Sequence, residues 1–303
     1  MKSPYQISGK VVLITGPARG IGAETARLLA ARGARLSLVG LEPELLAALA
    51  SELGAGHVWF ECDVTDQSAL ERAAAGTAEA LGGIDVVIAN AGVVSNGTVA
   101  VGPVEALVRT IDVNLTGVVR TVSATLAHVT EREGYYLLVS SAAALAPFPG
   151  ISTYAAAKSG VEQFGNVLRL ELAHKGVAVG VAHPSWIDTD MVRDAQNDLA
   201  GFREMLGKLP GPFGRVTPLR ECAEAFVHAV ERRKRKVYVP RTLAAAAAVR
   251  QFFMSSLADY IMGRQTRKTL PQVEAEVRAL GRSFGAHSTG LGAKPGGGET
   301  REG

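Results

Sequence analysis

The sequence predicts an α/β protein built on a doubly wound parallel sheet of seven strands, with helices on both faces. Three observations support this prediction: seven short apolar runs rich in β-branched residues, helical apolar spacing between successive runs, and a glycine-rich turn directly after the first run. Runs this apolar are typical of parallel strands that are buried on both faces. Because crossovers between parallel strands are right-handed, regular alternation places helices on both sides of the sheet.

The strands and helices are expected to alternate in chain order. The predicted strands are Val11–Thr15, Leu36–Val39, His57–Cys62, Val86–Ala89, Tyr135–Ser140, Val177–Ala182 and Val237–Val239. The segments between them have helical lengths and spacing, and helices are expected at Ala23–Arg32, Gln67–Leu81, Val104–Val129, Tyr154–Lys175 and Leu219–Arg232. Together these elements form one main domain, residues 1–240.

Two regions fall outside this alternation. Between 190 and 216 the pattern lapses into Gly, Pro and mixed polar residues, and so long a connection is interpreted as a lid. Residues 241–283 combine the Ala-rich stretch Leu243–Ile261 with the charged amphipathic stretch Gln272–Arg282, which predicts a helical appendage. From Phe284 to the end at 303, Gly, Ser, Thr and Pro dominate, and this composition predicts a disordered tail.

The overall composition narrows the class of protein. A formal charge of +3 is too small an excess to indicate a nucleic-acid partner or binding to a membrane surface. Cys62 and Cys222 are far apart and are expected to be reduced, buried thiols, with no metal site. No apolar run reaches spanning length, and two charged residues interrupt Leu243–Ile261, so that stretch suits a helix packed on protein. Without the pattern of a secretory signal, a cytoplasmic protein is expected.

A glycine-rich turn follows the first predicted strand and precedes an Ala-rich helix. Glycines in such a turn let backbone amides approach a pyrophosphate, which then lies at the positive end of the helix. The turn therefore predicts a dinucleotide site, although an ordinary glycine-rich turn is the alternative for this motif on its own. The residues expected to contact a dinucleotide are Gly16, Arg19, Gly20, Ile21 and Gly22.

With three residues between Gly16 and Gly20, the chain resembles the short-chain dehydrogenase/reductase family, from about Lys10 to Val239. The resemblance implies a Rossmann-like sheet with strand order 3-2-1-4-5-6-7 and makes residues 1–240 a catalytic domain. It also implies NAD(P)(H)-dependent oxidoreduction, in which an alcohol and a ketone or aldehyde are interconverted. The cofactor carries the hydride, and the protein contributes placement and proton transfer.

The resemblance assigns further residues to the cofactor. It places Asp63 and Val64 at the adenine ring, and Asn90, Ala91 and Gly92 on the floor of the site. The usual Asn-Asn-Ala-Gly of the family is Ala-Asn-Ala-Gly here, which is a mild departure. Taken alone, Asp63 also fits a helix cap and Asn90 a turn residue.

The resemblance also covers the loop after the sixth strand. This loop begins at Pro184, and the backbone of Ile187 and the side chain of Thr189 are expected to hold the nicotinamide carboxamide. Ser185 stands where the family has Gly, so the loop is expected to follow a slightly different path. The alternative for Pro184 is a purely structural turn residue.

The choice between NAD(H) and NADP(H) is expected to lie at the end of the second strand. An acidic side chain there accepts hydrogen bonds from the ribose hydroxyls, whereas a basic one attracts a 2′-phosphate. Gly40 occupies the position where relatives that prefer NAD carry Asp, and Arg19 stands where relatives that prefer NADP often carry a basic residue. Leu41 stands where many of the latter have Arg. NADP(H) is therefore favoured, with NAD(H) as the alternative.

Four residues form the predicted catalytic set. Tyr154 and Lys158 are four residues apart in a helical segment, so their side chains share one face, and the ammonium is expected to lower the phenol pKa. Family spacing makes Ser141 the group that holds the substrate oxygen and Asn114 the fourth residue, linking Lys158 to solvent through a water. An Asn inside a helix is locally unfavourable, so Asn114 is also expected to distort its helix.

Two other classes of function stay open. One is a catalytically silent dinucleotide sensor or scaffold, because a fold alone does not establish function. The other is epimerisation or dehydration by a similar Tyr and Lys. The intact catalytic set argues against the first, and the lack of a large sugar-nucleotide domain disfavours the second.

Substrate and assembly are only weakly indicated. Apolar residues in the lid, together with Phe148, Phe252 and Phe253, favour a small hydrophobic alcohol or ketone. The helices at Val104–Val129 and Tyr154–Lys175 are long enough to expose apolar faces to a symmetric partner. A homodimer or homotetramer is therefore expected.

Overall fold

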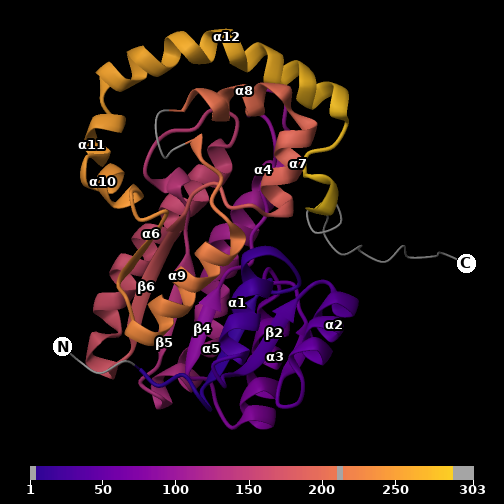
Figure 1. The fold of residues 1–303 in the computed structure, drawn as a ribbon, viewed down its shortest axis with the longest axis vertical. Coiled ribbons are helices and arrows are strands. Elements are labelled where there is room, and N and C mark those ends of the chain that lie inside the picture. Colours follow the sequence, from indigo (N-terminus) through magenta and orange to yellow (C-terminus); the bar gives the residue numbers. More distant parts are fainter. Residues whose placement is uncertain (1–4, 210–213, 289–303) are drawn as a thin grey trace, which may run out of the picture.

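The computed structural model describes residues 5–209 and 214–288, except for the side chain of Gln265. These residues contain a single parallel sheet with strand order β3-β2-β1-β4-β5-β6-β7, which confirms the predicted fold (Figure 1). Its strands are β1 (Val11–Thr15), β2 (Arg35–Gly40), β3 (Val58–Glu61), β4 (Val86–Ala89), β5 (Tyr135–Val139), β6 (Ala178–Pro184) and β7 (Lys236–Val239).

Helices cover both faces of this sheet because successive strand residues point to opposite sides. Val12 and Ile14 belong to the core on one face and Leu13 to the core on the other. The first face is covered by α1 (Gly20–Ala30), α2 (Pro43–Leu53) and α9 (Leu219–Arg232). The second is covered by α3 (Gln67–Leu81), α4 (Val104–Ile111), α5 (Gly117–Glu131) and α6 (Ser152–Glu171).

The helix predicted at Val104–Val129 is interrupted. A π-helical turn, Asp112–Thr116, separates α4 from α5. Within it the side-chain amide of Asn114 donates to the carbonyl oxygen of Thr110 at 2.8 Å and to that of Val93 at 2.6 Å. The side chain thus bonds the carbonyl four residues before it, and the expected distortion of the helix lies at this residue.

The segment interpreted as a lid contains two helices rather than irregular chain. These are α7 (Asp190–Asp198) and α8 (Ala200–Lys208). Residues 210–213, which belong to the same predicted lid, lie outside the described residues. The segment is therefore a helical insertion between β6 and α9, which leaves its action as a lid a proposal.

The C-terminal appendage is helical, as expected, and contains α10 (Leu243–Ala248), α11 (Arg250–Phe253) and α12 (Ser256–Leu280). Helix α12 runs without a break through Pro271 and arches over α8 at one end of the molecule (Figure 1). Among the described helices, none combines the length and the apolar character that crossing a bilayer requires.

Residues 282–288, called the strap below, correct the prediction that the chain is disordered from Phe284 onward. Phe284 is buried and pairs with Ser95 in an antiparallel bridge. Arg282 forms a 2.6 Å ion pair with Asp198 at the end of α7. The composition of this segment does not indicate these contacts, because their partners lie far away in the chain. Residues 289–303 of the predicted tail lie outside the described part.

A buried carboxylate connects α6 to the last strand and to the appendage. Glu162 is only 5% exposed and accepts hydrogen bonds from Lys236 of β7 at 3.2 Å and from Arg250 of α11 at 2.9 Å. The Nε2 atom of His183 lies 3.5 Å away on β6. Burial opposes ionisation of Glu162, but the adjacent His183 ring and the hydrogen bond from Lys236 outweigh it and lower its pKa to about 2.

We predict that Glu162→Gln lowers the free energy of unfolding by about 2 kcal/mol at pH 7, because it removes the charge that pairs with two cations. A lowered carboxyl pKa contributes stability that is present above pH 4.5 and is lost as the pH falls toward about 2. The difference between variant and wild type should therefore shrink in that range. Urea unfolding at several pH values measures it, and a difference independent of pH would contradict the role of the charge.

Candidate active site

A cleft opens at the carboxyl ends of the strands, where the chain order of the sheet reverses between β1 and β4. The hydroxyl oxygen of Thr15, at the end of β1, accepts hydrogen bonds from the backbone amides of Asn90 and Ala91 after β4, at 3.0 and 3.1 Å. The side-chain amide of Asn90 donates to the carbonyl oxygens of Thr15 and Gly16 at 3.0 and 3.1 Å. Asn90 therefore holds the glycine-rich turn against the end of β4.

Most residues predicted for cofactor and catalysis line this one cleft. They are Gly16, Arg19, Gly20, Ile21, Gly40, Leu41, Asp63, Val64, Asn90, Ala91, Gly92, Asn114, Tyr154, Lys158, Pro184, Ile187 and Thr189. Gly22 and Ser141 are not among its lining residues. Gly22 packs behind the turn, and Ser141 is buried beside Pro184, whose carbonyl oxygen lies 3.5 Å from its hydroxyl.

The glycine-rich turn has no room for larger residues. Gly16 and Gly20 have positive φ angles of 64° and 56°, which disfavour other residues. A Cβ on Gly16 would lie 2.8 Å from the Cα of Ala91, and one on Gly22 would lie 2.6 Å from the carbonyl oxygen of Gly16. The turn therefore presents bare backbone at the N-terminus of α1, which suits a phosphate group.

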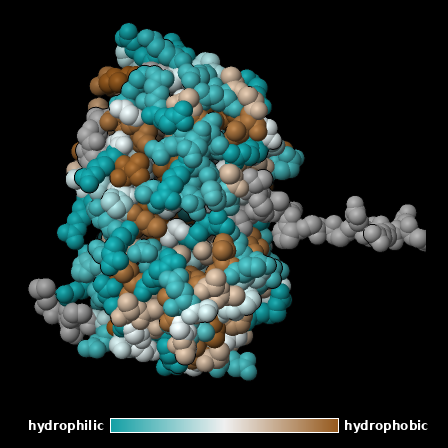
Figure 2. Space-filling view, turned by 45° about the vertical axis from the view of Figure 1, so that its right-hand side comes forward, coloured by the Kyte–Doolittle hydropathy of each residue, from teal (hydrophilic) through white to brown (hydrophobic). Residues whose placement is uncertain are grey.

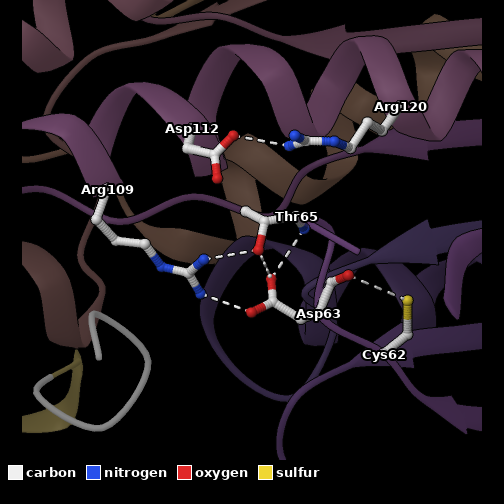
Figure 3. A network of polar contacts seen from close by, with 6 residues as sticks. All are labelled: Cys62, Asp63, Thr65, Arg109, Asp112 and Arg120. Carbon is white, nitrogen blue, oxygen red and sulfur yellow. Dashed lines mark hydrogen bonds and ion pairs between the residues drawn. The ribbon is translucent and has the colours of Figure 1, made fainter. Parts of the chain in front are cut away.

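A buried ion pair lies at the end of the cleft assigned to adenine (Figure 3). The guanidinium of Arg109 donates to Asp63 at 2.7 Å and to the hydroxyl of Thr65 at 2.7 Å. The other carboxylate oxygen of Asp63 accepts from the amide and the hydroxyl of Thr65, both at 2.9 Å. Burial opposes ionisation of Asp63, but the bonds from Thr65 and Arg109 outweigh it and lower its pKa. Both carboxylate oxygens thus have partners within the protein.

Arg19 is engaged by carboxylates at the same end of the cleft. Its guanidinium forms an ion pair with Glu42 and lies 3.9 Å from a carboxylate oxygen of Asp190. Glu42 follows Gly40 and Leu41 directly after β2 and also lines the cleft. The cation expected to receive a 2′-phosphate therefore already has an acidic partner, which the sequence reasoning did not include.

The side chains of Tyr154 and Lys158 meet at the other end of the cleft. The ammonium of Lys158 lies 5.5 Å from the centre of the Tyr154 ring and donates to the carbonyl oxygen of Val139 at 2.9 Å. The hydroxyl of Ser140 donates to the backbone oxygen of Lys158 at 2.7 Å, which ties α6 to the end of β5. The helical spacing thus places both groups on one face, at the end of a strand.

Burial controls the protonation of this pair. It raises the pKa of Tyr154, and a hydrogen bond with Ser141 offsets this only in part. Burial also lowers the pKa of Lys158 to about 7. Burial and Ser141 account for the shift of the Tyr154 pKa here, so a lowering of this pKa by Lys158 stays a prediction.

Asn114 lies below this pair on the π-helical turn. It is fully buried, and its side-chain oxygen has no hydrogen-bond partner among the described residues. A Cβ on Gly92 would lie 2.6 Å from that oxygen and 3.5 Å from the Lys158 ammonium nitrogen. A glycine at this position therefore keeps a space between Asn114 and Lys158, and a free acceptor borders that space.

The loop after β6 forms one wall of the cleft. The Thr189 hydroxyl donates to the carbonyl oxygen of Ile187 at 3.2 Å, and Ile187 is held in a parallel bridge with Thr217. Trp186 makes edge-to-face contacts with Phe148 and Phe202, with ring centroids 5.8 and 5.3 Å apart. These three aromatic rings pack together next to the loop that carries the predicted cofactor residues.

The strap supplies a side chain to the same cleft. His287 lines it, and its Nδ1 atom lies 2.8 Å from the buried carboxylate of Asp194 on α7. The backbone amide of His287 donates to the other oxygen of that carboxylate at 2.9 Å. On the opposite side, the amide of Asn96, in the loop after β4, donates to the carbonyl oxygen of Ser283 at 2.8 Å. The strap thus joins the two walls of the cleft.

Sequence reasoning missed Glu42, Arg109, Asp194 and His287. Their partners are 23 to 93 residues away along the chain, so no local pattern indicates the contacts. Of these four, only Glu42 could have been predicted from the sequence, because an acidic residue just after the second strand influences the choice between NAD(H) and NADP(H). Phe252, expected near the substrate, is exposed on the appendage instead.

The groups that line the cleft are chemically suited to a dinucleotide. The glycine-rich turn offers backbone amides to phosphates, Asp63 and Arg109 border the pocket, and Lys158 offers an ammonium to hydroxyls. The glycines leave no side chain in the way, as their close backbone contacts show. Within the described residues, no cluster of His, Cys, Asp and Glu has the arrangement of a metal site.

Comparisons with known proteins identify relatives of this chain. Residues 10–200 match a family model described as short chain dehydrogenase. The chain is 30% identical to a trans-4-hydroxycyclohexanecarboxylate dehydrogenase of Sinomonas cyclohexanicum over 73% of its length and 86% of the relative. It is 32% identical to the 3-oxoacyl-(acyl-carrier-protein) reductase FabG of Escherichia coli, over 72% and 88%. A glycine betaine reductase of Emericella nidulans is 34% identical over 61% of the chain, which is only 15% of that larger protein.

We predict that removing the strap weakens dinucleotide binding. A chain ending at Gly281 loses the contacts of Arg282 and His287 with α7, so α7 is no longer held across the cleft. The dissociation constant should rise by about tenfold, the effect of losing roughly 1.4 kcal/mol. Isothermal titration calorimetry measures it.

The matched control is a chain ending at Ser288, which keeps the strap and should bind like the full chain. His287→Ala isolates the single side chain, with the exposed His174→Ala as its control. Equal affinity of the two truncated chains would contradict the prediction.

Proposed function

The chain belongs to the short-chain dehydrogenase/reductase family, and from this premise we propose that it interconverts an alcohol and a ketone or aldehyde with a nicotinamide cofactor. Members of this family are NAD(P)(H)-dependent oxidoreductases. The observation that carries the proposal is the meeting of Tyr154 and Lys158 in the cleft that also contains the glycine-rich turn.

In the proposed mechanism, Tyr154 exchanges a proton with the substrate oxygen. A bound nicotinamide cofactor would supply or accept the hydride at the substrate carbon. Because burial raises the pKa of Tyr154, the phenol is protonated near neutral pH and suits the role of acid in carbonyl reduction. The Ser141 hydroxyl holds the substrate oxygen next to the phenol. Lys158 holds ribose hydroxyls, and the free oxygen of Asn114 orders a water that connects Lys158 to solvent.

We propose a hydrophobic substrate. The rings of Phe148, Trp186 and Phe202 are partly exposed and adjoin the wall of the cleft, so they offer apolar surface to a bound molecule. Two relatives are named for a cyclohexanecarboxylate and for an oxoacyl chain, and both names describe molecules with apolar parts. The proposed substrate is therefore a small alcohol or ketone with an alicyclic or aliphatic body.

The proposed assembly is a homodimer or homotetramer. Five apolar side chains are exposed on the helices of one layer: Val104, Val108, Val119, Val167 and Leu170. They belong to α4, α5 and α6, the helices expected to face a symmetric partner. Their burial against a second copy would remove this apolar surface from water.

We predict that Tyr154→Phe lowers kcat by at least about 100-fold, because the variant has no proton to exchange at the substrate oxygen. Cofactor affinity should stay close to normal, since the ring remains. A panel of ketones and alcohols, followed at the nicotinamide absorbance, measures turnover, and calorimetry measures binding. The exposed Tyr260→Phe serves as the control.

Two results would count against the proposal. Retained turnover in Tyr154→Phe would remove the phenol from the mechanism. A wild-type protein that binds the dinucleotide but turns over no member of the panel would support a silent sensor.

NADP(H) is the proposed cofactor, and NAD(H) is the alternative. Arg19 is the cation that would receive a 2′-phosphate, which would have to replace Glu42 as its partner. Glu42→Gln should therefore tighten NADP(H) binding by about tenfold, since a competing charge is removed, and should leave NAD(H) nearly unchanged. Arg19→Ala should weaken NADP(H) alone. Calorimetry with both cofactors decides, and a clear preference of the wild type for NAD(H) would reverse the assignment.

A further inference from the structure

The outer side of the appendage exposes a concentrated set of apolar side chains. Six large residues within thirteen positions have exposed fractions between 49% and 65%. Single exposed apolar residues are ordinary on protein surfaces, but a concentration of them marks an interaction site. The six, called the appendage patch below, are Val249, Phe252, Met254, Leu257, Tyr260 and Ile261.

Cationic side chains continue the same face of α12. Leu257, Ile261, Arg264 and Lys268 follow one another at steps of four, three and four residues, so they form one stripe along the helix. All four are exposed. Arg267 lies beside this stripe and is exposed too. The first turns of the outer face are therefore apolar and the next turns are basic.

The inner face of α12 packs on the protein. Ala258 and Val277 are buried there. Farther along the helix, Thr98 donates to Glu274 at 2.7 Å, and Glu276 accepts from the amide of Gly201 on α8 at 3.1 Å. These contacts fix the inner face of α12 against the protein, so the opposite face of the helix points to solvent.

The cations of this region are available to a partner. In residues 5–209 and 214–288, Arg264, Arg267 and Lys268 form no salt bridge with another side chain. Between positions 241 and 270 the chain has five Lys or Arg residues and one carboxylate, Asp259. Arg250 pairs with Glu162, and the four other cations outnumber Asp259 by three, which already equals the net charge of +3 for the whole chain.

We propose that the appendage patch docks on the surface of an anionic lipid bilayer, with α12 lying in the plane of the interface. An amphipathic helix with apolar side chains and Lys or Arg on its outer face binds in this way, and each cation near an anionic surface adds to the attraction. Arg and Lys stems extend along the apolar boundary while their charges reach the headgroups.

The shape of the region favours lipid over a folded protein partner. Helix α12, which carries Leu257, Tyr260 and Ile261, arches outward at the end of the molecule (Figure 1). At that end, hydrophobic and hydrophilic side chains lie next to one another (Figure 2). A convex helix can insert its apolar side chains among headgroups, whereas it offers no pocket for the side chains of a protein partner.

Docking would place the membrane at the end of the molecule that α12 and α8 form, because Glu276 of α12 bonds to Gly201 of α8 (Figure 1). The docking itself rests on the appendage alone and does not depend on the proposed reaction.

The test is flotation of the full-length protein with two kinds of vesicle, one of phosphatidylcholine and one with phosphatidylglycerol added. We expect binding to the anionic vesicles, weakening as the salt concentration rises, and little binding to the neutral ones. Leu257→Ser with Ile261→Ser, and separately Arg264→Glu with Arg267→Glu, should each lower the vesicle-bound fraction by at least tenfold. All these side chains are exposed, so the fold should tolerate the changes.

Control variants alter other faces of the protein. Arg72→Glu with Lys175→Glu changes the charge equally, and Trp59→Ser removes an exposed apolar side chain of β3. These variants should float like the wild type, and every variant should turn over a water-soluble substrate normally. Absence of binding to anionic vesicles, or equal binding by the α12 variants, would overturn the proposal. A patch that instead joins two copies would show a lower molar mass in the Leu257 and Ile261 variant by light scattering, and that result would also overturn it.

Discussion

The architecture of this protein depends on the reversal of strand order between β1 and β4. The chain leaves β1 toward β2 and β3 on one side and resumes at β4 on the other, so the loops at their carboxyl ends diverge and leave a cleft. Thr15 and Asn90 bond across this divergence, and their bonds keep the two strand ends together beneath the glycine-rich turn. The glycine-rich turn, Tyr154 and Lys158 all border the cleft that opens at this junction.

Buried charge is the second constraint, and helix α6 carries much of it. Tyr154, Lys158 and Glu162 follow one another at intervals of four residues, so one face of the helix bears a phenol, an ammonium and a carboxylate. The ammonium bonds to the end of β5, and the carboxylate bonds to β7 and the appendage. Removing such groups from water is costly, and their partners offset the cost only while the helix keeps this position. The contacts of Glu162 thus help to position Tyr154 and Lys158, although they lie outside the cleft.

The features that could be predicted from the sequence are those that a short stretch of residues determines by itself. The strands and helices α3 and α9 follow from apolar spacing, whereas their order in the sheet was implied by the family resemblance. The spacing of Tyr154 and Lys158 placed the two side chains on one face of α6. Helix α2 was not predicted, although Pro43 at its first turn is a typical start signal. Asn114 indicated a distortion of its helix, but its form, a π-helical turn that divides the predicted helix into α4 and α5, was not predicted. The direction of the Tyr154 pKa shift depends on burial, and the strap depends on contacts with α7, neither of which a linear pattern records.

The position of the strap in the chain bears on how the protein is made. Ribosomes synthesise proteins from the N-terminus, and domains begin to fold as they emerge. The sheet, the glycine-rich turn and α7 all leave the ribosome before residues 282–288, which then close over elements that are already in place. In a nascent chain, the residues of the sheet are therefore available for folding before the strap that joins the two walls of the cleft. A chain stopped early by a nonsense codon in α12 would contain every strand of the sheet and still lack the segment that joins the two walls.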